Sequence, residues 1–262
     1  MRKSKIKIVI LGCIGIFLIA ALLLLPTKQA KAETLIESSL FFRVYLAFSV
    51  DQKATQAWLP APWKAVSLPK GPFKGANVYV IFTDWFITQD GEGKPDKGGT
   101  LCCTALVAFG KNPQTKEFAT FITRIYAHYD GSGPFKNTVK ARVSREATIK
   151  GVTSKPGASS EVWKVQDSAG GIMEFRMDYQ RSVPKRTKKE FKVHSSVEPD
   201  IFFNCQDDYA SDLVKSIPAG INRVQNYKFR TTISELHKMF DGSEQLVGIS
   251  INPCRARQVF LP

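Results

Sequence analysis

The segment Leu40–Pro62, LFFRVYLAFSVDQKATQAWLPAP, contains the clearest change of secondary structure in the chain. Its first part, Leu40–Val50, is rich in aromatic and β-branched residues, which favours a β-strand. Asp51 then predicts an N-cap for a short helix over residues 52–58, because its carboxylate can accept hydrogen bonds from the first backbone N–H groups. The two prolines at the end of the segment stop that helix, since each disfavours helical geometry in the preceding residue.

Similar β patterns occupy most of the remaining chain. Thr100–Phe109 is apolar on both faces, so we expect a strand that is buried on both. Other strands are predicted at 78–86, 118–128, 137–150, 161–166, 171–179, 191–193, 225–229, 246–251 and 258–261. Short helices are predicted over Asp208–Lys215 and from a capping box at Thr232–Glu235 to Phe240. About ten strands without regular strand–helix alternation indicate an α+β fold, mainly antiparallel β, arranged as a sandwich or barrel.

Residues 1–32 have the pattern of a secretory signal or a membrane anchor. Four basic residues among the first seven precede an uncharged apolar run, Ile8–Leu25, and Ala30-Lys31-Ala32 fits a small-x-small cleavage site. The alanines favour cleavage, but the run is also close to the minimum length for a spanning helix, so retention as an anchor stays open. In both cases residues 33–262 are predicted to form one domain outside the cytoplasm: periplasmic, extracellular or anchored.

The net charge of +14 includes one dense basic cluster in the second half of the chain. A solvated loop or edge strand is the favoured interpretation of this cluster, and contact with an anionic membrane surface is the second. Nucleic acid is not an expected partner, because an exported protein rarely meets it. The cluster consists of Lys185, Arg186, Lys188, Lys189 and Lys192.

The cysteines and histidines do not predict a metal site. Cys102, Cys103, Cys205 and Cys254 remain after cleavage, and an oxidising compartment would permit two disulfides in three pairings. Buried thiols are the alternative. The three histidines are far apart, and no spacing resembles that of zinc ligands.

The segment Val50–Pro62 resembles the start of the acetoacetate decarboxylase superfamily, in which a strand leads through an aspartate and a short helix into Pro-x-Pro. Gly133–Asn137, GPFKN, is similar to that family's aromatic–proline–lysine–lysine segment, and the terminal VFLP is compatible with it. The resemblance covers the chain from Leu40 to its end. It implies an acetoacetate decarboxylase-like β-barrel or sandwich, a homo-oligomer, and no metal or organic cofactor.

The resemblance also implies site residues. Lys136 takes the position of the Schiff-base lysine, which attacks a ketone and must be neutral to do so, and therefore needs a depressed pKa. Arg43 lies near the family's active-site arginine, and His128 lies at a strand end beside a glycine-rich turn; both are candidate substrate-binding residues. The family's second lysine is replaced by Asn137, and Asp84 is the only acid on the two strands where the family has glutamates.

Two functions follow. The first is an exported enzyme that acts on a keto acid or related carbonyl compound through Lys136. The alternative is a non-catalytic β-barrel that binds a small apolar or acidic ligand in the cell envelope, with an apolar pocket lined by aromatic residues and a polar head steered by Arg43 or Lys136. The first requires the Lys136 side chain to point into a closed cavity, which distinguishes the two.

Overall fold

The computed structural model describes residues 33–96, 98–129, 133–151 and 155–261. The predicted signal or anchor over residues 1–32 and its cleavage site lie outside these ranges, as do residues 130–132 of the predicted turn. In the described part of the chain, none of the helices has the length and hydropathy required to cross a membrane.

Strands make up nearly all of the regular secondary structure in the described chain. Its two helical segments are the α-helix α2, Gln52–Gln56, and the 3₁₀ turn η1, Ser234–Leu236. The strands are β1 Thr34–Ser49, β2 Lys64–Ala65, β3 Val78–Asp90, β4 Leu101–Lys111, β5 Phe118–Ala127, β6 Thr138–Ile149, β7 Ala158–Asp167, β8 Ile172–Gln180, β9 Lys185–Ser195, β10 Phe202–Ser216, β11 Ile221–Asn222, β12 Val224–Thr231 and β13 Gln245–Leu261.

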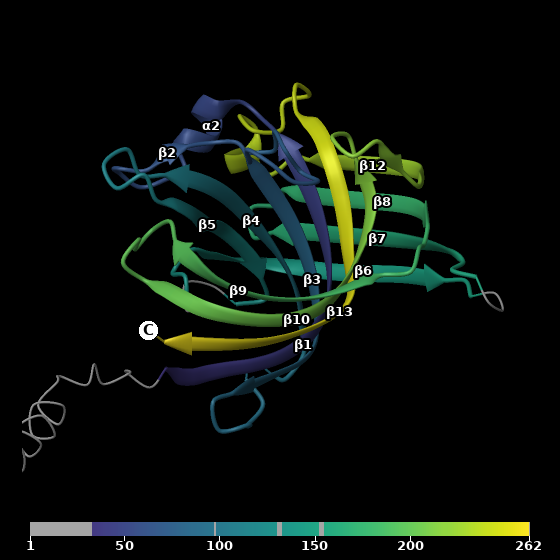
Figure 1. Cartoon of the computed structure of the whole chain (residues 1–262), viewed down its shortest axis with the longest axis horizontal. Helices are drawn as coiled ribbons and strands as arrows, with labels where there is room; N and C mark the ends of the chain where they lie inside the picture. The colour runs from purple at the N-terminus through teal and green to yellow at the C-terminus, as the bar shows by residue number, and fades with distance from the viewer. Residues whose placement is uncertain (1–32, 97, 130–132, 152–154, 262) are drawn as a thin grey trace, which may run out of the picture. The chain divides into compact units, whose positions relative to one another are not determined.

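The sheet closes on itself to form a barrel. Strands β5, β9, β10, β13, β1, β3 and β4 follow one another in hydrogen-bonded order, and an antiparallel pairing of β4 with β5 completes the ring. The β5–β9 pairing is parallel and short. Strands β6, β7, β8 and β12 continue the sheet from β5 as a second layer, visible in Figure 1 as a stack of strands beside the barrel wall.

Strand alternation gives the barrel wall two different faces, because successive side chains of a strand point to opposite sides. On β1, Phe42, Val44 and Leu46 join the main hydrophobic core, which also contains residues of β7 and β8 in the second layer. The rings of Phe82 on β3 and Phe175 on β8 stack across this core with centroids 5.4 Å apart. The intervening residues of β1 therefore face the inside of the barrel.

The segment Leu40–Pro62 folds into a strand and a short helix as predicted, with small shifts of the boundaries of both elements. Strand β1 begins six residues before the predicted strand, at Thr34, and ends one residue before its predicted end, at Ser49. The Asp51 carboxylate caps α2 by accepting hydrogen bonds from the backbone N–H groups of Lys53 and Ala54. The helix ends at Gln56, two residues before the predicted end.

The predicted helix over Asp208–Lys215 is wrong, because these residues belong to strand β10. Burial alternates along much of the strand, as expected for a strand with one face inside a barrel. The neighbouring Asp207 does not begin a helix: its buried carboxylate is bound by Arg255 and Arg257 of the adjacent strand β13.

The predicted helix from Thr232 to Phe240 is also wrong, since the structure has only the 3₁₀ turn η1 there. The Thr232 hydroxyl does not cap η1; it accepts a hydrogen bond from the backbone N–H of Ile172, 3.0 Å away. Glu235 accepts hydrogen bonds from the Tyr126 hydroxyl and from Arg124, at 2.6 and 2.5 Å. Both residues of the supposed capping box thus make tertiary contacts.

The two strands predicted at the end of the chain are one continuous strand, β13. Its pairing with β1 shifts register between Arg255 and Asn252, so that Pro253 falls in a bulge. A bulge tolerates proline because the missing N–H is not needed for the ladder.

Candidate functional site

A cavity of about 810 Å³ lies inside the barrel and is called the lumen below. All strands of the ring contribute residues to its lining, together with Leu68, Pro72 and Phe73 from the connection between β2 and β3. A cavity of this size lies within the range typical of sites for small organic ligands.

One side of the lumen is apolar. Ile81 of β3, Val107 and Phe109 of β4, and Ile122 of β5 line it and pack against one another. Such a wall offers no charge or hydrogen bond to a ligand. It therefore favours a hydrocarbon body through the hydrophobic effect.

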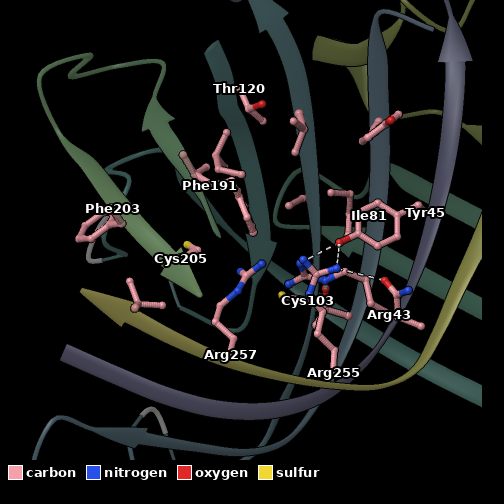
Figure 2. A pocket seen from close by; sticks show the side chains of 18 of the residues that line it. Arg43, Tyr45, Ile81, Cys103, Thr120, Phe191, Phe203, Cys205, Arg255 and Arg257 are labelled. Atoms are coloured by element: carbon pink, nitrogen blue, oxygen red, sulfur yellow. Dashed lines mark hydrogen bonds between the residues drawn. The ribbon is translucent and has the colours of Figure 1, made fainter. Parts of the chain in front are cut away.

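Three arginines from two adjacent strands point into the same part of the lumen (Figure 2). Arg43 lies on β1, and Arg255 and Arg257 lie on β13. The Tyr45 hydroxyl lies between two of them and accepts hydrogen bonds from Arg43 Nη1 at 3.3 Å and from Arg255 Nη1 at 2.6 Å. These four residues are called the arginine cluster below.

Asp207 supplies one negative charge behind this cluster. Its carboxylate accepts hydrogen bonds from Arg257 Nε at 2.8 Å and Nη2 at 3.1 Å, and from Arg255 Nη2. Burial by itself would raise the pKa of Asp207, but the charges and hydrogen bonds of Arg257 and Arg255 outweigh it and lower the pKa to about 2. The Asp207 carboxylate is therefore ionised at neutral pH, and both of its oxygens already accept hydrogen bonds from Arg255 or Arg257.

Arg43 has no such counter-charge. Its side chain is 7% exposed, its Nε donates to Thr83 Oγ1 at 3.0 Å, and its guanidinium lies 4.3 Å from the centre of the Phe41 ring. Among the ion pairs of the described residues, none includes Arg43. Burial lowers its pKa, with repulsion from Arg257 and Arg255 adding to the effect and Tyr45 opposing it.

The same positive charges act on Tyr45. Burial alone would raise the pKa of this phenol, but the charges of Arg255 and Arg43, followed by Arg257, outweigh it and lower the pKa. A tyrosine with a lowered pKa inside a cavity is a feature of functional sites more often than of passive cores.

Three further charged residues line the lumen. Lys189 of β9 pairs in register with Asp207 but has an exposed side chain. Glu37 and Asp96 also line it; Glu37 is near the start of β1, aligned with Val259, two positions beyond Arg257. The arginine cluster is consequently the buried, cationic part of the lumen.

The structure brings only one of the three predicted site residues to the lumen. Arg43 lines it, whereas His128 is exposed and packs edge-on against the Tyr129 ring, with centroids 5.1 Å apart. Lys136 is exposed as well, with a φ of 56°, and is absent from the lining although Pro134 and Phe135 contribute to it.

The Lys136 side chain is thus accessible to solvent and does not contribute to the lining of the lumen. The catalytic role of Lys136 stays a prediction.

Sequence reasoning gave no site role to Asp207, Arg255 and Arg257, and it expected aromatic residues in the lining without singling out Tyr45. One signal was available: two arginines separated by one residue within a strand place both charges on the same face. Asp84, the acid noted on β3, faces the other side of the wall, where Arg145 Nη1 binds its carboxylate at 2.8 Å.

None of the four cysteines Cys102, Cys103, Cys205 and Cys254 forms a disulfide. Within the described ranges, no group of three or more histidine, cysteine or acidic side chains is arranged to hold a metal ion.

No family model and no curated protein matches the chain. Solved structures do match it. An acetoacetate decarboxylase-like enzyme from Sphingomonas wittichii RW1 superposes with a TM-score of 0.54 at 9% identity, covering 87% of this chain and 91% of that one. The enduracididine biosynthesis enzyme MppR, complexed with the condensation product of pyruvate and imidazole 4-carboxaldehyde, gives 0.52 at 10% identity, covering 86% and 87%. The expected acetoacetate decarboxylase-like fold is therefore confirmed.

Proposed function

We propose that this acetoacetate decarboxylase-like barrel binds a small organic anion with an apolar body in its lumen, without catalysing a reaction on it. The observation that carries the proposal is Arg43, a buried guanidinium on the lumen wall that has no carboxylate partner among the described residues. The N-terminal sequence adds the expectation that the domain works outside the cytoplasm.

The energetics favour such a ligand. A buried charge without a partner is costly, and an anion beside Arg43 would offset that cost. A hydrogen bond to a charged group contributes about 1.5–3 kcal/mol, and the apolar wall adds roughly 25 cal/mol for each Å² of hydrocarbon removed from water. Similar structures support the ligand class, since MppR has been solved with pyruvate and with the buffer HEPES.

Calorimetric titration of the full chain with octanoate and with pyruvate tests the proposal. We expect saturable binding at one site, weakened by about 10- to 100-fold in Arg43→Gln, because one charged hydrogen-bond donor is lost. Arg186→Gln is the matched control, since Arg186 is exposed and pairs with Asp208 on β10. The proposal fails if neither anion binds, or if Arg43→Gln binds like the unchanged chain.

Carbonyl chemistry through Lys136 is the second candidate function, and the enzymes among the similar structures favour it. It is tested by adding acetoacetate, pyruvate or longer keto acids, reducing with borohydride, and mapping the peptides by mass spectrometry. An adduct on Lys136 that is absent from Lys136→Ala would support an enzyme. If the folded chain traps no carbonyl compound, ligand binding without catalysis is the candidate function that is left.

A further inference from the structure

The buried charges of the lumen do not balance. Arg43, Arg255 and Arg257 carry three positive charges, and Asp207 supplies one negative charge to this group. Glu37 is separated from Arg43 by about 20 Å of strand, and in register it lies beyond Arg257. The three arginines and Asp207 therefore carry a net charge of +2, and Glu37 lines the lumen on the Arg257 side of this group.

The same residues have unused hydrogen-bond donors. Arg43 donates through Nε and Nη1, which leaves Nη2 without a partner among the described residues. Tyr45 accepts two hydrogen bonds, and its own hydroxyl proton has no acceptor there. Arg255 Nε is also without a hydrogen bond to the described residues, but it has almost no accessible surface and is out of reach of a ligand in the lumen. A head group with several anionic oxygens matches this set of donors better than one with a single oxygen.

A monoanion would leave one of the two excess charges uncompensated in a buried site, where an uncompensated charge is most costly. Resting on the function proposed above, we infer that the lumen ligand carries two negative charges on its head, as a phosphomonoester or a dicarboxylate does. The head lies between Arg43, Tyr45 and Arg255, and the hydrocarbon body lies along Ile81 and Val107.

The test uses ligands of equal chain length that differ in head charge. The n-octyl ester of phosphoric acid is a dianion at about pH 8, because the second ionisation of a phosphomonoester lies near pH 6. Octyl sulfate has the same tetrahedral oxygen arrangement but a single charge, and 2-octylsuccinate supplies a dicarboxylate. Each is titrated into the full chain by calorimetry.

We expect octyl phosphate or 2-octylsuccinate to bind at least about tenfold more tightly than octyl sulfate, as one additional charge-assisted contact would give. The tighter of the two dianions identifies the head group. Lowering the pH to about 5.5 should reduce the affinity for octyl phosphate toward that for octyl sulfate, because the phosphate then loses its second charge.

Variants give a second readout. In Arg43→Gln the preference for the dianion should disappear, whereas Arg186→Gln should keep it. Equal affinities of octyl sulfate and both dianions for the unchanged chain would overturn the inference while leaving anion binding intact. If none of the three ligands binds, the proposed function itself fails.

Discussion

Asp207 is held between Arg255 and Arg257 with its carboxylate side chain fully withdrawn from solvent. Asp207→Asn removes the counter-charge of two buried guanidinium groups. We expect the free energy of unfolding at neutral pH to fall by about 3–5 kcal/mol, the cost of breaking a buried pair by removing one partner. Chemical denaturation measures it, and Asp208→Asn, on the half-buried next residue whose partner Arg186 is exposed, is the control that should change stability little.

The contacts of Asp207 with Arg255 and Arg257 also predict that the stability of the folded chain depends on pH in the acid range. The folded-state pKa of about 2 lies below the unfolded value of about 4. The stabilisation is therefore complete above pH 4 and is lost as the pH falls from 4 towards 2. Asp207→Asn should show a shallower loss of stability over this window, and identical slopes for the two chains would contradict the assignment.

Tyr45 should ionise below the usual pH for a phenol, because the charges of Arg255 and Arg43 favour the phenolate. A spectroscopic pH titration of tyrosinate absorbance should show one early step that is missing in Tyr45→Phe. Saturation with an anionic ligand should move this step to higher pH, since an added negative charge disfavours the phenolate. A step that survives in Tyr45→Phe would assign it to another residue.

At the residue scale the sequence indicated only part of the site. Arg43 could be found because the resemblance placed it near the family's active-site arginine on the first strand. Asp207 could not, because its role depends on a strand about 50 residues later in the chain coming alongside it. Lys136 and His128 lie on exposed positions near a turn, where a short motif does not determine whether a side chain points inward.

At the scale of elements, Gly248 of β13 has a specific packing role. A Cβ built there would lie 2.6 Å from Cδ1 of Phe73, which lines the lumen, and 2.7 Å from the carbonyl oxygen of Lys215. Gly248→Ala should lower the free energy of unfolding by about 1–3 kcal/mol through overpacking, measured by denaturation. Gly151→Ala, where a Cβ would meet nothing within 4 Å, should leave stability nearly unchanged.

Strands with strict alternation were predictable, and the helices near the C-terminus were not. The Asp51 cap was correct because it is satisfied within four residues of sequence. Thr232 and Glu235 form a capping box in sequence, which is also a local signature, but β8 and β5 provide tertiary partners for their side chains. A local capping rule does not include such competition.

At the scale of the whole described domain, the fold class followed from local patterns, but the closure of the barrel did not. The ring depends on the β4–β5 pairing, between strands that follow each other in the chain, and on a short parallel pairing of β5 with β9. Strands β5 and β9 are distant in sequence. This closure creates the lumen and turns alternate residues of β1 into its lining. The site therefore becomes visible only with the three-dimensional arrangement.

The basic cluster on β9, of which Lys189 lines the lumen and Arg186 and Lys188 do not, gives a separate prediction about contact with anionic surfaces. Arg186 Nη2 lies 2.6 Å and Lys188 Nζ lies 3.9 Å from Asp208 Oδ2. This carboxylate partly offsets the positive charge of the cluster. We expect weak sedimentation with anionic vesicles that disappears as salt rises, because exposed charges are screened. Replacing Lys185, Arg186, Lys188 and Lys189 together by glutamine should abolish it. Binding that survives this change would place membrane contact elsewhere.

We propose, above all, that Arg43 holds an anion inside the barrel. A crystal structure of the full chain grown with octyl phosphate tests it most directly. We expect the phosphate within hydrogen-bonding distance of Arg43 Nη2 and the Tyr45 hydroxyl, with the octyl chain along the apolar wall of β3 and β4. A phosphate bound on the outer surface, with only water beside Arg43 at a saturating ligand concentration, would contradict it.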